Sequence, residues 1–133
     1  MYKILPNLAV HGFNGTAKIT KVNMTIDEME VGEIDGFVIN DVRYIDDLGG
    51  NDIKDYLFEI DRISFMLSFD MNVVVCCEAG QSRSNAIALG VLIKHFNMDF
   101  YDAWELIKKK NPTCNIDPSH IVKLKKLFGV TTP

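Results

Sequence analysis

The sequence has few cysteines, no long hydrophobic stretch and no excess of positive charge. Its three cysteines, an odd number among 133 residues, do not fit the paired framework of a small disulfide-rich secreted domain. The longest apolar run, Ala86–Ile93, is too short to span a membrane. A net charge of −4 disfavours a general nucleic-acid binder or a protein that binds anionic membranes.

The sequence also shows no recognisable targeting signal and no linker between domains. The first ten residues are interrupted by Pro6 and Asn7 and are too short for a signal peptide, so we expect a reduced, cytoplasmic protein. No repeat or Pro/Gly/Ser-rich linker is present, which predicts one domain over residues 1–133. With 47% hydrophobic and 24% charged residues, a chain of this length can bury a core of its own.

The order of expected elements predicts an α/β fold. Period-two patterns and turn residues predict strands at Lys3–Leu5, Leu8–Val10, Ile19–Met24, Gly36–Ile39, Val42–Ile45 and Val73–Cys76. Helical spacing predicts helices at Ile53–Phe69, Asn85–Phe96, Asp99–Lys110 and Pro118–Phe128, with Asp117 as N-cap and Gly129 at the end of the last one. We therefore expect a short central, mainly parallel sheet flanked by helices.

The most informative segment lies between a buried strand and a buried helix. Val73–Cys76 is continuously apolar, as in a central strand, and the eight residues that follow it lead into an apolar helix. Ligands of α/β sheets bind just beyond the carboxyl ends of strands, and a helix N-terminus there attracts anions. The sequence therefore predicts an anion site at residues 77–84.

Two residues of this segment carry the chemistry. Cys77 stands at the strand end, where a helix N-terminus and a nearby cation favour the reactive thiolate. Arg83, six residues later, offers a planar fork that can pair two phosphate oxygens, and Ser84 adds a hydroxyl near the sulfur. Gly80 allows the loop to curl so that backbone N–H groups point inward. The predicted phosphate-binding loop comprises Glu78, Ala79, Gly80, Gln81, Ser82 and Arg83.

These residues resemble the signature loop of the protein tyrosine phosphatases, Cys-x5-Arg-Ser/Thr. Residues 77–84 read Cys-Glu-Ala-Gly-Gln-Ser-Arg-Ser and are most similar to the dual-specificity phosphatases, whose loop typically reads His-Cys-x-Ala-Gly-x-Ser-Arg-Ser. Ile19–Thr25 resembles an early strand of that family, and Asn111-Pro112 followed by Pro118 resembles its C-terminal stretch. The resemblance covers nearly the whole chain.

The resemblance implies a protein tyrosine phosphatase-like fold and hydrolysis of phosphotyrosine and/or phosphoserine/threonine through a cysteinyl-phosphate. Cys77 would be the nucleophile, Arg83 the phosphate ligand and Ser84 an aid to the departing thiolate. The family's general acid is an aspartate on a loop between a strand and a helix. Alignment on the helix start favours Asp47, with Asp46 second. The implied partner is a phosphorylated protein or peptide, and the mechanism needs no metal or other cofactor.

One departure keeps a second function open. The family usually has a histidine before the nucleophile, where this chain has Cys76. Loss of that imidazole suggests an alternative, a pseudophosphatase that binds phosphoproteins with little turnover. A sulfurtransferase or arsenate reductase ranks lower, because no resolving thiol is evident. The absence of lysine from residues 78–82 disfavours a phosphoinositide substrate, and the acidic net charge disfavours an RNA 5′-phosphatase.

Overall fold

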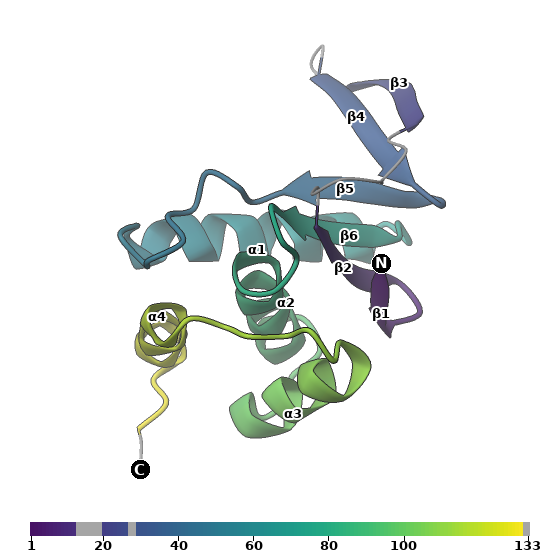
Figure 1. The fold of residues 1–133 in the computed structure, drawn as a ribbon. Helices are drawn as coiled ribbons and strands as arrows, with labels where there is room; N and C mark the ends of the chain where they lie inside the picture. Colours follow the sequence, from purple (N-terminus) through teal and green to yellow (C-terminus); the bar gives the residue numbers. More distant parts are fainter. Residues whose placement is uncertain (13–19, 27–28, 132–133) are drawn as a thin grey trace.

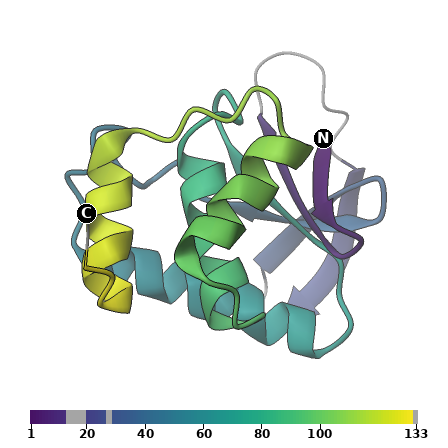
Figure 2. The same cartoon turned by 90° about the horizontal axis from the view of Figure 1, so that it is seen from below.

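The computed structural model describes residues 1–12, 20–26 and 29–131. The chain runs in the order β1 (Tyr2–Leu5), β2 (Leu8–Gly12), β3 (Thr20–Ile26), β4 (Met29–Ile34), β5 (Phe37–Asp41), α1 (Ile53–Ser68), β6 (Val73–Cys77), α2 (Arg83–Lys94), α3 (Phe100–Lys110) and α4 (Pro118–Phe128). The strands form one sheet, and the four helices of the described residues lie on one face of it (Figures 1 and 2). The predicted α/β class is confirmed.

The sheet is mixed, which corrects the prediction of mainly parallel strands. Its order is β1-β2-β6-β5-β4-β3, and the parallel pairs among the described strands are those of the central strand β6 with β2 on one side and β5 on the other. The outer pairs are antiparallel because their connections are short. Asp35 and Gly36, both with positive φ, join β4 to β5 as a two-residue hairpin turn, a signal that the sequence contains.

A second correction concerns Val42–Ile45, which is a turn and not a strand. The Val42 N–H still donates to the Cys76 carbonyl at 2.9 Å, which is a last bond to β6. The Ile45 N–H then donates back to the Val42 carbonyl at 3.1 Å, so the chain turns away from the sheet. This turn carries the chain towards the N-terminal end of α1 (Figure 1). The predicted strand Ile19–Met24 corresponds to β3, although Ile19 itself lies outside the described residues.

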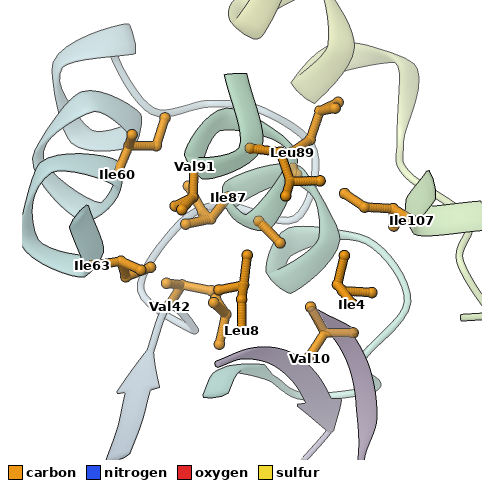
Figure 3. Close-up of a cluster of buried hydrophobic side chains, with 14 of the residues drawn as sticks. Ile4, Leu8, Val10, Val42, Ile60, Ile63, Ile87, Leu89, Val91 and Ile107 are labelled. Carbon is orange, nitrogen blue, oxygen red and sulfur yellow. The ribbon is translucent and has the colours of Figure 1, made fainter. Parts of the chain in front are cut away.

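The core lies between the sheet and the helices. Alternate residues of β6 face opposite sides, so Val73, Val75 and Cys77 join the helical core whereas Val74 and Cys76 face away. Figure 3 shows the contributing side chains of this core. They include Ile4, Leu8, Val10, Val42, Ile60, Ile63, Ile87, Leu89, Val91 and Ile107, all buried. Each such side chain contributes about 1.5–3 kcal/mol through burial, and together they hold α2 against the end of β6.

The helix ends follow the predicted capping residues. The Asp117 side chain accepts from the Ser119 N–H at the start of α4, where Pro118 occupies the first turn. Gly129 ends α4 in the left-handed conformation. Within the described part of the chain, no helix combines the length and the hydrophobicity needed to cross a bilayer.

Candidate active site

The segment predicted to bind an anion forms a loop between β6 and α2. Cys77 is the last residue of β6, and Arg83 is the first residue of α2, so the loop joins a central strand to a helix N-terminus. Cys77 is only 1% exposed. Its sulfur lies 3.2 Å from the Ser84 hydroxyl oxygen and accepts the Gly80 N–H at 3.2 Å. The structure therefore brings a thiol, a hydroxyl and an inward-pointing amide together at the start of α2.

A buried pair of amide side chains holds the loop in its curled shape. Gly80 has a φ of +72°, and its carbonyl accepts from the side chains of Asn85 at 2.9 Å and Asn111 at 3.3 Å. Asn111 also donates to the Asn85 side-chain oxygen at 3.1 Å and accepts from the Thr113 N–H at 3.0 Å. These hydrogen bonds fix the Gly80 carbonyl on one side of the residue, and the Gly80 N–H donates to the Cys77 sulfur on the other.

Sequence reasoning missed Asn85 and Asn111. The only signal for Asn85 is an amide at the start of an otherwise apolar helix, and Asn111 beside Pro112 indicates no more than the end of a helix. Both residues are fully buried. A buried amide needs partners for its donors and acceptors, which is the physical reason why such residues indicate a network.

The end of β2 supports the loop from behind. A Cβ atom added to Gly12 would lie 2.6 Å from the Ala79 carbonyl carbon and 2.9 Å from the Glu78 carbonyl oxygen. A Cβ atom at Gly80 would likewise lie 2.7 Å from the Gly12 nitrogen. The two backbones therefore touch at glycines, and the position of β2 fixes the position of the loop.

The Arg83 side chain is held by backbone carbonyls. Its Nη1 donates to the carbonyl oxygens of Arg43 at 2.8 Å and Ile45 at 3.2 Å. Its Nε lies 3.4 Å from the Asp47 carboxylate but has no hydrogen-bond acceptor among the described residues. A buried N–H without an acceptor costs free energy, which a ligand oxygen beside it would recover.

The two candidate acids lie differently. Asp47 is well exposed, with 66% of its side chain accessible, and forms the ion pair with Arg83. Asp46 turns back into its own loop, where its carboxylate accepts the Leu48 N–H at 3.0 Å. Of the two, Asp47 is therefore the carboxylate that the structure brings to the loop.

A cluster of charges lies at the rim of the loop. Arg43 pairs with Asp41 at 2.8 Å and lies 3.8 Å from the carboxylate of Glu78. Burial alone would raise the pKa of Asp41, but hydrogen bonds and charge from Arg43 lower the pKa below its ordinary value. Asp41 therefore stays ionised and holds Arg43 in place.

Cys76 differs from Cys77 in position and in chemistry. Its side chain joins the small cluster on the opposite face of the sheet, with Ala9, Phe37 and Val74. Burial raises the pKa of Cys76 to about 12, and the charges of Asp41 and Cys77 act in the same direction. Cys76 is therefore an unreactive core thiol. The described residues contain no cluster of three or more histidine, cysteine or acidic side chains that could hold a metal ion.

Comparison with known proteins identifies the class to which this fold and loop belong. The model of the dual specificity phosphatase catalytic domain matches residues 6–128, so the chain belongs to that family. The Drosophila melanogaster dual specificity protein phosphatase MPK-4 is 35% identical over 66 residues, which cover 50% of this chain and 17% of MPK-4.

Solved structures agree at the level of the fold. Human DUSP28 superposes with a TM-score of 0.58 at 19% identity, over 62% of this chain and 58% of that one. The human tyrosine phosphatase-like serine/threonine/tyrosine-interacting protein superposes with a TM-score of 0.55 at 22% identity, over 60% of this chain and 53% of that one. The chain thus spans little more than half of these structures and a small part of MPK-4.

Proposed function

We propose that this chain hydrolyses phosphate monoesters on phosphorylated proteins or peptides, at phosphotyrosine and/or phosphoserine/threonine. The observation that carries the proposal is the arrangement at the start of α2. The Cys77 sulfur lies 3.2 Å from both the Gly80 N–H nitrogen and the Ser84 hydroxyl, and the buried Nε–H of Arg83 has no hydrogen-bond acceptor in the part of the chain that the structure describes. A phosphate bound here would fill the unmet hydrogen bond and place its phosphorus before the sulfur.

The first step transfers the phosphoryl group to Cys77. The sulfur attacks phosphorus, the S–P bond forms, and the bond from phosphorus to the leaving oxygen breaks. Arg83 and the loop N–H groups bind the equatorial oxygens, whose charge they stabilise in the transition state. Asp47 gives its proton to the leaving oxygen, which its exposed position beside Arg83 allows.

The second step releases phosphate. Water attacks phosphorus while Asp47, now ionised, takes a proton from that water, and the S–P bond breaks. The departing thiolate is stabilised by the Ser84 hydroxyl at 3.2 Å and by the Gly80 N–H. No step uses a metal ion.

A specific observation also supports a second function, a phosphoprotein-binding module with little turnover. Position 76 carries a buried thiol in place of the family's usual histidine, so no imidazole stands before the nucleophile. The chain also shares its fold with the human tyrosine phosphatase-like serine/threonine/tyrosine-interacting protein, whose name refers to interaction. The intact set of Cys77, Arg83, Ser84 and Asp47 favours the enzyme.

The test measures hydrolysis of an aryl phosphate by reduced protein in the presence of a chelator. We expect turnover in the wild type, no detectable turnover in Cys77→Ser, and a loss of about 10²–10⁴-fold in Asp47→Asn. Cys114→Ser and Asp46→Asn are the matched controls and should retain activity.

Phosphopeptide binding separates the two functions. The binding module requires an inactive wild type that binds phosphopeptide as tightly as Cys77→Ser does. An inactive wild type that also fails to bind phosphopeptide would exclude both functions.

A further inference from the structure

A fully buried carboxylate lies on the sheet-facing side of α1, outside the catalytic machinery described above. Glu59 is 0% exposed, and its two oxygens have three partners. Oε1 accepts from the Asn40 side chain at 3.1 Å and pairs with Arg62 at 3.0 Å, and Oε2 accepts the Tyr44 hydroxyl at 3.2 Å. Arg62 also donates to the Asn40 oxygen at 2.8 Å, which closes the network.

Such a carboxylate is costly unless all of its partners stay in place. Transfer of an ionised group out of water is compensated only by good pairing geometry and by hydrogen bonds to its remaining lone pairs. The Glu59 network meets this requirement with residues from β5, from α1 and from the connection between them (Figure 1). The network therefore ties that connection to α1 at the Tyr44 hydroxyl.

Tyr44 stands at the point where this connection meets Arg83. The residues on either side of it, Arg43 and Ile45, supply the two carbonyl oxygens that accept from Arg83 Nη1. Tyr44 is 54% exposed, so packing alone holds it weakly. Burial raises the pKa of Tyr44 to about 12, with Glu59 acting in the same direction, so the hydroxyl remains a donor.

We propose that Glu59, acting through Tyr44, is a positioning residue for Arg83, an inference that rests on the phosphate-binding role proposed above. The network holds the carbonyls of Arg43 and Ile45 in place, and these carbonyls occupy Nη1. The Nε–Nη2 side of the guanidinium is the fork that pairs two oxygens of a phosphate. With Nη1 fixed, the Nε–H on that side has no hydrogen-bond acceptor among the described residues and can donate to an oxygen of a ligand.

Oxyanion affinity is the direct readout, and it needs no turnover. Inorganic phosphate should protect Cys77 from alkylation by iodoacetate, and the concentration for half protection reports phosphate affinity. Tyr44→Phe removes only the hydroxyl and leaves Glu59 paired with Asn40 and Arg62. We expect it to weaken phosphate binding about three- to tenfold, which corresponds to the net contribution of one ordinary hydrogen bond. Glu59→Gln should weaken binding in the same direction.

The matched control is Tyr101→Phe, another partly exposed tyrosine whose ring lies on α3. This variant should bind phosphate as the wild type does. The double variant Tyr44→Phe/Arg83→Lys decides the route of the effect, since residues that act as a unit are not additive. We expect Tyr44→Phe to cause no further loss once Arg83 is replaced by lysine.

Each outcome separates this inference from the proposed function. Wild-type protein that phosphate does not protect would refute both. Protection of the wild type with unchanged affinity in Tyr44→Phe and Glu59→Gln would refute the positioning role alone. An undiminished effect of Tyr44→Phe in the Arg83→Lys background would also refute it, because the hydroxyl would then act elsewhere.

Discussion

Replacing Gly12 by alanine should displace the loop that follows β6 and lower the activity without unfolding the protein. The added Cβ would lie 2.6 Å from the Ala79 carbonyl carbon, whereas two carbon atoms in contact prefer about 3.5 Å. The neighbours are backbone atoms, so the loop or β2 must move by about 1 Å. A misplacement of that size can cost about 10²-fold in rate.

The stability cost should be small by comparison. Overpacking costs about 1–3 kcal/mol, and part of this is offset because alanine restricts the unfolded chain by about 0.4–1 kcal/mol relative to glycine. We therefore expect kcat/KM for an aryl phosphate to fall about 100-fold while the free energy of unfolding falls by about 2.6 kcal/mol or less. Urea denaturation of the same preparations measures the second quantity.

Gly129→Ala is the matched control. No atom of the described residues lies within 4 Å of a Cβ at this position, but its φ of +64° strains an alanine by about 1–2 kcal/mol. We expect this variant to lose stability and keep full activity. If Gly12→Ala retained wild-type activity, or if both variants lost activity in proportion to stability, the argument that β2 sets the position of the loop would be wrong.

Three further predictions follow from buried groups. Burial lowers the pKa of His120, although the charges of Asp117 and Asp47 oppose this shift, so below about pH 6.5 the folded state binds fewer protons than the unfolded state. The free energy of unfolding should therefore fall between about pH 7 and pH 5, and it should fall less in His120→Gln. Urea denaturation that gave the same pH dependence for the wild type and for His120→Gln would contradict this. Asn111→Ala leaves the Thr113 N–H without its acceptor and should lower the free energy of unfolding by about 1–3 kcal/mol. A loss below about 1 kcal/mol in urea denaturation would be inconsistent with the network. Ser84→Ala should slow hydrolysis of the cysteinyl-phosphate about tenfold, so that a stoichiometric burst of aryl product appears before the slower steady state. An equal loss in formation and hydrolysis of the intermediate would exclude a role for Ser84 in stabilising the departing thiolate.

Several elements follow from local pattern alone. The helices α1, α3 and α4 agree with the predicted ranges to within a residue because amphipathic spacing and caps such as Asp117 act over one or two turns. The buried strand before the loop is equally local, since Val73–Cys77 is an uninterrupted apolar run. The mixed sheet was not predicted, because β4 went unrecognised although the turn at Asp35 and Gly36 was present in the sequence.

Some residues around the loop can be predicted from the sequence and others cannot, because only some of their contacts are local in the chain. Cys77, Arg83 and Ser84 lie within eight consecutive residues, where a strand end and a helix start constrain them together. Asn111 reaches Gly80 across 31 positions of the chain, and its neighbours in sequence give no indication of that contact. Helix propensity and turn signals describe backbone conformation and do not report a partner that is distant in sequence.

Neighbouring residues along the chain are enough to specify the strand–loop–helix unit at residues 73–94 and the spacing between Cys77 and Arg83. The family resemblance favours Asp47 over Asp46, but the contact of Asp47 with Arg83 depends on the fold, because the two carboxylates are chemically alike and differ in the direction they face. The fold also decided that the backbone carbonyls of Arg43 and Ile45 hold that arginine, 40 and 38 positions away. Contacts of this kind arise when packing brings distant segments together, and no local pattern records them.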